Sequence, residues 1–145
     1  MPGVLLDTHA LYWLVSGDDV LSDEAKVAIA EAQSTRSLLL SPINAWELSV
    51  ATRKVRVAGR PHLGDEPPDR WFRDATDVTR ARIVPIQQRI ALKAARVVSD
   101  TGHKDPGDCF LIATARLRRA ALVTRDAIIR TIASDRPGYL DLIVC

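Results

Sequence analysis

The sequence predicts an α/β domain of three layers, in which helices cover both faces of a parallel sheet of about five strands. Short apolar runs, each too short for a helix, alternate along the chain with longer segments of helical pattern. Neighbouring parallel strands need a crossover between them, and helical crossovers cover both faces of the sheet. The chain has 145 residues, a length that suits one domain, so residues 1–145 are expected to form a single unit.

Five apolar runs are expected to form the strands, at residues 4–6, 37–40, 82–86, 120–124 and 140–144. Helical patterns cover residues 23–32, 43–55, 89–98 and 109–117, and a short helix is expected around 71–78. Residues 59–70 contain two Gly and three Pro and are expected to form a surface loop. Two helix starts are marked by a capping residue directly before a proline, at Ser41-Pro42 and Asp105-Pro106.

The composition is typical of a globular protein. Hydrophobic residues make up 47% of the chain and charged residues 26%, which excludes a disordered or fibrous protein. No apolar run reaches the ~18 residues of a membrane span. The N-terminal segment has no basic region and carries Asp7 in its apolar stretch, so we expect a cytoplasmic protein without membrane contact. Neither the two cysteines nor the three histidines have the spacing of a zinc site.

The charge is unevenly distributed along the chain. The net charge is +2, but residues 1–72 carry 7 basic against 10 acidic residues, and residues 73–145 carry 13 against 8. A basic excess beside a few unexplained acids suits a polyanionic substrate handled through metal ions. Four basic residues are candidate phosphate contacts, although solvated surface charge explains any one of them: Arg53, Lys54, Arg56 and Arg125.

Two carboxylates follow predicted strands. Asp7 comes immediately after the run at 4–6, and Asp126 lies two residues beyond the run at 120–124. In open parallel sheets the ligand crevice lies at the carboxyl ends of the strands, so both acids are candidate site residues. The alternative is that each only caps the helix that follows it.

Glu47 is expected on an apolar helix face. In the helix that begins at Ser41-Pro42, its position falls on the same side as Ile43 and Val50. Burying an unpaired carboxylate is strongly unfavourable, so Glu47 needs a partner. That partner is either an arginine in a structural ion pair or a metal ion.

Asp105 and Asp108 lie three residues apart at a predicted helix start. The helix dipole favours acids there, so a structural role explains either one alone. Because Asp105 precedes Pro106, we expect it to cap the helix by accepting from the backbone N–H of Gly107 or Asp108. With the three acids above, the pair forms a set of oxygen ligands without His or Cys, which suits Mg²⁺ or Mn²⁺.

Four segments occur in an order and spacing typical of one known family: LLDTHALYWL at 5–14, SPINAWELSV at 41–50, HKDPGDCFLIATARL at 103–117 and LVTRD at 122–126. With these motifs the chain resembles the PIN-domain ribonucleases, and among them the VapC-type toxins of toxin–antitoxin pairs. The resemblance implies a three-layer α/β/α PIN-like fold, an acidic metal site, and endonuclease activity on RNA that depends on Mg²⁺ or Mn²⁺.

The resemblance implies catalytic and metal-binding roles for four acids: Asp7, Glu47, Asp108 and Asp126. Thr124 matches a hydroxyl residue that accompanies the last acid, and Asp105 belongs to a DPxD form found in part of the family. The family usually has Arg after the second Asp of that form, where this chain has Cys109. A cognate antitoxin and a homodimer are also implied.

Two other classes of protein remain open on the residues alone. A metal-dependent phosphatase or phosphotransfer domain uses an acid at a strand end, but its common DxD form needs an acid at position 9, which is His9 here. A non-catalytic binding module on the same fold is expected to lack one of the four acids, and none is missing. For a nuclease, we expect Asp7 and Asp108 to bind the main ion, while Glu47 and Asp126 bind a second ion or orient its waters.

Overall fold

The fold is built around one sheet of five parallel strands. The computed structural model describes residues 3–17, 20–54 and 61–145. The strands are β1 (Val4–Leu6), β2 (Leu38–Leu40), β3 (Arg82–Ile83), β4 (Ala121–Thr124) and β5 (Leu142–Val144). Their order across the sheet is β3-β2-β1-β4-β5, with every neighbouring pair parallel. All five predicted strands are therefore confirmed, each within its predicted run.

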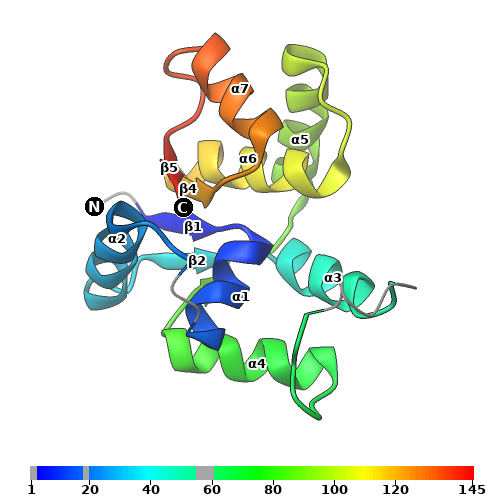
Figure 1. The fold of residues 1–145 in the computed structure, drawn as a ribbon. Helices are drawn as coiled ribbons and strands as arrows, with labels where there is room; N and C mark the ends of the chain where they lie inside the picture. The colour runs from blue at the N-terminus through cyan, green and yellow to red at the C-terminus, as the bar shows by residue number, and fades with distance from the viewer. Residues whose placement is uncertain (1–2, 18–19, 55–60) are drawn as a thin grey trace.

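Seven helices cover the two faces of the sheet in the described residues (Figure 1). They are α1 (Thr8–Ser16), α2 (Asp23–Ser34), α3 (Pro42–Ala51), α4 (Pro68–Thr79), α5 (Gln88–Thr101), α6 (Pro106–Arg118) and α7 (Ala127–Asp135). The first four lie on one side of the sheet and the last three on the other. The predicted α/β/α arrangement is confirmed.

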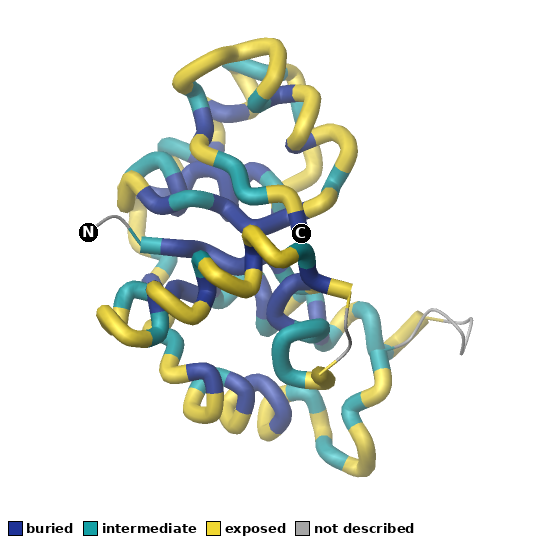
Figure 2. The backbone as a smooth tube through the Cα atoms, turned by 60° about the vertical axis from the view of Figure 1, so that its left-hand side comes forward, coloured by how far each residue is buried: buried dark blue, intermediate teal, exposed yellow. Residues whose placement is uncertain are grey.

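The alternation of side chains along β1 divides the core in two. Leu6 faces α1, α2 and α4, whereas Leu5 faces α5, α6 and α7. Both leucines are fully buried, because parallel strands covered by helices have no face in water. Figure 2 shows the consequence, with buried strands inside and exposed outer helix surfaces. β1 is thus the centre of the molecule, between β2 and β4.

Side-chain caps fix the starts of five helices, and Ser22 provides the cap of α2. Ser41 caps α3 with a reciprocal bond to Asn44, and Asp105 caps α6, so both predicted starts are confirmed. Asp7 caps α1, and Asp126 caps α7. Each cap satisfies a backbone N–H that has no partner inside its helix. The caps also fix where these polar side chains lie at the edge of the sheet.

Three details differ from the sequence prediction. α4 begins at Pro68, inside the expected loop at 59–70, because proline suits the first helical position; residues 59–60 lie outside the described residues. α3 ends at Ala51 and does not continue through the described residues 52–54 of the predicted range. The buried side of α3 carries Asn44 and Leu48, whereas Val50, expected on that side, is 45% exposed.

None of the helices in the described residues has both the length and the apolar character needed to cross a bilayer.

Candidate metal centre

The candidate site lies at the carboxyl edge of the sheet. Asp7 follows the last residue of β1, and Thr124 is the last residue of β4, with Asp126 two residues beyond it. α3 supplies Glu47, and the start of α6 supplies Asp105 and Asp108. Because β1 and β4 are parallel neighbours, their carboxyl ends meet at one place, as the crevice rule for such sheets requires.

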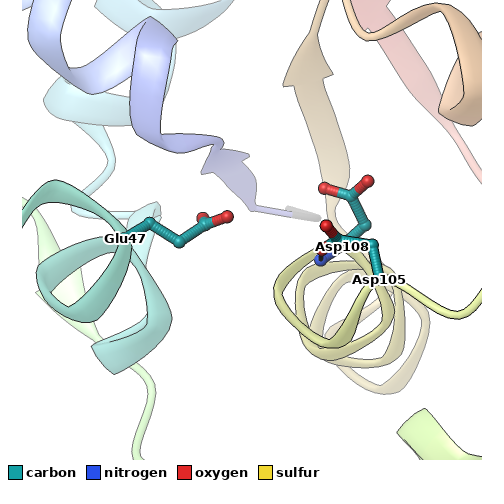
Figure 3. A group of neighbouring side chains, drawn as sticks. All are labelled: Glu47, Asp105 and Asp108. Carbon is teal, nitrogen blue, oxygen red and sulfur yellow. Dashed lines mark hydrogen bonds between the residues drawn. The ribbon is translucent and has the colours of Figure 1, made fainter. Parts of the chain in front are cut away.

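Glu47, Asp105 and Asp108 come together from two helices. One carboxylate oxygen of each lies within 4.8 Å of the others. Figure 3 shows Glu47 extending from α3 toward the start of α6, where the two aspartates lie. Glu47 lies more than fifty positions from the two aspartates in the sequence, and the fold makes them neighbours. A group of three carboxylate oxygens fits a hard divalent cation such as Mg²⁺ or Mn²⁺.

Neighbouring polar groups hold the carboxylate of Glu47. The Thr8 hydroxyl donates a hydrogen bond to Glu47 Oε1 at 2.7 Å. The amide of Asn44, which is fully buried, donates to Thr8 Oγ1 at 3.2 Å and to the Leu6 carbonyl at 3.3 Å. No lysine or arginine of the described residues forms a salt bridge with Glu47, so the structural ion pair that the sequence left open is absent there.

Gly107 allows α6 to approach Glu47. A Cβ atom built on Gly107 would lie 2.6 Å from Glu47 Oε2 and 3.0 Å from Glu47 Cδ, which is closer than van der Waals contact permits. Any side chain at this position would therefore displace the Glu47 carboxylate. Sequence reasoning did not identify this role, because a glycine in the first turn of a helix carries no signal of what faces it.

His103 is a second residue that sequence reasoning missed. Its Nε2 lies 2.8 Å from Asp108 Oδ2, and the two side chains are 10% and 19% exposed. The thiol of Cys109 donates to the His103 carbonyl at 3.2 Å, which fixes the backbone before α6. A five-residue separation across a helix start matches no recognised ligand spacing, so the pattern gave no indication of this pair.

Asp7 is the most deeply buried acid of the site, at 9% exposure. Its Oδ1 accepts from the backbone N–H of Ala10 at 2.7 Å, so the capping interpretation holds. Burial raises the pKa of Asp7, and a hydrogen bond from the Thr124 side chain opposes that rise. Thr124, predicted as a supporting residue, therefore acts on the first acid of the set as well as accepting from the backbone N–H of Asp126.

Asp126 stands apart from the cluster of three. Its Oδ1 accepts from the backbone N–H of Ile129 at 2.9 Å, which makes it the cap of α7. Its charge nevertheless acts on the site, because it raises the pKa values of both Asp7 and Asp108. The five predicted acids thus lie close enough for their charges to interact. Three of them have carboxylate oxygens close enough together to bind one metal ion.

Burial and mutual repulsion disfavour negative charge at this site. Desolvation raises the pKa of Glu47, and the nearby charges of Asp108, Asp105 and Asp7 raise it further. Desolvation likewise raises the pKa of Asp108, with the hydrogen bond to His103 opposing the shift. A bound cation would stabilise crowded carboxylates of this kind, so the electrostatics agree with a candidate metal centre.

The basic residues expected beside the site differ in their contacts and exposure. Arg125 donates to the backbone carbonyls of Cys145 and Val20 and lies over the Trp13 ring, 4.3 Å from its centroid. Arg125 is exposed, and its guanidinium already has these partners within the chain. Arg53 is exposed just beyond α3, and Arg56 lies outside the described residues.

Solved structures with this fold include a member of the VapBC family of toxin–antitoxin systems. A chain of the DNA-bound VapBC from Salmonella typhimurium matches with a TM-score of 0.63 at 15% identity, covering 99% of this chain and 98% of that chain. VapBC-5 from Mycobacterium tuberculosis matches with 0.61 at 15% identity over 100% of both chains. FitAcB from Neisseria gonorrhoeae matches with 0.60 at 20% identity, covering 97% and 96%.

The expected likeness to VapC-type proteins is therefore confirmed at the level of the fold. No curated protein matches the sequence significantly. The model of the PIN domain family, however, matches residues 4–134, which include every acid described above. The chain belongs to the PIN domain family.

Proposed function

We propose that the protein is a divalent-metal-dependent endoribonuclease that hydrolyses phosphodiester bonds in RNA and acts as the toxin of a VapBC-type pair. The observation that carries this proposal is the convergence of Glu47, Asp105 and Asp108 beside the buried Asp7, with no lysine or arginine of the described residues paired to them. Such a group is costly in a protein without a cation to offset it. Its place at the carboxyl edge of a PIN-domain sheet supports nuclease chemistry.

The proposed ligands are Asp7, Glu47, Asp108 and Asp126, with Asp105 and Thr124 in support. When bound, Mg²⁺ or Mn²⁺ supplies Lewis acidity and lowers the pKa of its water, which suits attack on a phosphodiester. The residues of the chain do the positioning. Thr8 orients the Glu47 carboxylate, and His103 holds one oxygen of Asp108. No paired Ser–His or Cys–His nucleophile is present among the described residues to offer a covalent route.

The first experiment is a cleavage assay on mixed RNA with Mg²⁺, with Mn²⁺ and with excess EDTA. We expect cleavage with either ion and none with EDTA. A phosphate monoester assayed in parallel separates a nuclease from a phosphatase, since the proposed nuclease leaves the monoester intact. Undiminished RNA cleavage in EDTA would rule out the metal mechanism, and the absence of any hydrolysis would favour the binding module.

The proposed antitoxin partner rests on the likeness to toxin–antitoxin proteins of known structure, and the proposed homodimer rests on the family resemblance alone. Expression of the chain alone should slow growth, and Asp7→Asn should relieve the inhibition. Asparagine still caps a helix, so the variant keeps the start of α1 while losing a charged oxygen ligand. Equal inhibition by both proteins at matched levels would argue against nuclease toxicity. Light scattering of the purified chain tests the dimer.

A further inference from the structure

A group of cations gathers at the end of the molecule opposite the acidic site. Three of them lie on α5 at helical spacing, and three lie at the end of α6. They line adjoining hollows, of which the central one has a volume of about 510 Å³. We call this surface the basic hollow, defined by Arg89, Lys93, Arg96, Arg116, Arg118 and Arg119.

Two carboxylates line the basic hollow, those of Asp100 and Asp141. None of its six cations forms a salt bridge with a described carboxylate. The acid that lines its central part, Asp100, accepts a hydrogen bond from the Tyr139 hydroxyl at 3.0 Å. Arg116 is held in place by the Tyr139 carbonyl at 3.0 Å and by stacking on the Tyr139 ring at 3.5 Å. The surface therefore combines one guanidinium held by Tyr139 with further cations that line the same hollows.

The metal centre cannot supply affinity for a polyanion by itself, since its own groups are acidic. Arg125, a basic candidate at the sheet edge, already donates to two backbone carbonyls. Asp108 lies in the first turn of α6 and Arg118 in its last, so about 15 Å of helix separates the two sites. An RNA strand must extend over several nucleotides to reach both.

We propose that the basic hollow is a second binding site, which takes the phosphate backbone of the RNA substrate outside the bond that is cleaved. The inference rests on the proposed function, because it takes RNA as the polyanion. Charge complementarity favours this ligand, since each hollow cation can neutralise one phosphate and release its counterions. The site would add affinity without reading sequence, as backbone contacts do.

The test compares two variants with the same change in net charge. One carries Arg89→Gln, Lys93→Gln and Arg96→Gln in the basic hollow. The control carries Arg36→Gln, Arg80→Gln and Arg82→Gln, three exposed residues of another hollow of about 520 Å³. The ligand is a fluorescent single-stranded RNA of about 30 nucleotides, and its anisotropy is measured in EDTA between about 50 and 200 mM salt.

We expect the hollow variant to bind more weakly, with the slope of log K against log salt reduced by about 2, because three contacts contribute about 0.7 each. The control should match the wild type. Unchanged binding by the hollow variant, or equal weakening of both variants, would overturn the proposal. So would a hollow variant that becomes monomeric where the wild type is a dimer, since the surface would then be a contact between copies.

The outcome is separable from that of the proposed function. Binding in EDTA does not depend on cleavage, so an inactive protein whose RNA binding depends on the basic hollow would refute the nuclease and support the second site. A metal-dependent nuclease whose RNA binding does not change in the hollow variant would support the nuclease and refute the second site.

Discussion

The hydroxyl of Thr8 donates a 2.7 Å hydrogen bond to Oε1 of Glu47, joining the residue after Asp7 to the middle of α3. Asn44 donates in turn to Thr8, and its own oxygen accepts from the Ser41 backbone N–H. The capping box that starts α3 is thus continuous with the contact that aims Glu47. Asn44 therefore helps both to start α3 and to position Glu47 through Thr8.

Replacing Thr8 with valine should weaken metal binding while the protein remains folded. Valine has a similar shape but cannot donate, so the Glu47 carboxylate loses its orientation. We expect several-fold lower Mn²⁺ affinity by calorimetry, with Thr8→Ser close to the wild type because serine retains the hydroxyl. Equal Mn²⁺ affinities for the valine and serine variants would show that the bond does not position Glu47.

Gly107→Ala should impair the site without loss of stability. The added methyl group would lie 2.6 Å from Glu47 Oε2 and must displace that carboxylate. Alanine is also the better helix former, by up to about 1 kcal/mol, so the free energy of unfolding should stay the same or rise. RNA cleavage and thermal melting check the two halves of the prediction. Pro106→Ala, at an exposed position of the same turn, is the control and should retain activity.

Glu47→Gln should abolish most cleavage while leaving the metal-free protein equally or more stable. Burial raises the pKa of Glu47 above its unfolded value, so the ionised form is disfavoured in the native state. The stability that Glu47 contributes is fully present below its unfolded pKa and is lost as pH rises through the folded pKa. Glutamine removes this loss.

The melting temperatures of wild type and Glu47→Gln should therefore coincide at about pH 3, where the unfolded glutamate is protonated, and diverge in favour of glutamine as pH rises toward 7. Added Mn²⁺ should reverse the order, since only the carboxylate binds it well. A glutamine variant that is markedly less stable at pH 7 without metal would indicate a structural role for Glu47.

Asp105 and Asp108 should respond differently to removal of charge. Asp105 Oδ1 accepts from the Asp108 backbone N–H at 2.9 Å, which confirms the predicted cap. Asparagine caps about as well as aspartate, so Asp105→Asn should retain most cleavage, whereas Asp108→Asn should lose nearly all of it. Asp105→Ala should lower the free energy of unfolding by about 1 kcal/mol.

The cap does not by itself remove Asp105 from the site. Asp7 and Asp126 also use Oδ1 for capping, and each keeps a second carboxylate oxygen. Asp105 also lies within joint ligand distance of Glu47 and Asp108. An Asp105→Asn protein that stays folded but is as inactive as Asp108→Asn would make Asp105 a working ligand.

The sequence was most informative where local signals act alone. The strands and the proline-marked helix starts at Ser41 and Asp105 are local, and the structure confirms them. The face of α3 was predicted wrongly because Asn44 is polar yet buried, satisfied by partners on other elements. His103 and Gly107 were missed for a related reason. Their roles depend on what the tertiary fold places beside them.

The central position of β1 has a consequence for the newborn chain. Its two neighbours in the sheet, β2 and β4, are made at very different times, since β4 begins only at Ala121. During translation Asp7 and Glu47 leave the ribosome long before α6 and β4 exist to complete the arrangement. A nascent chain that stops before β4 therefore lacks part of the candidate site, so the proposed activity requires synthesis to have passed Asp126.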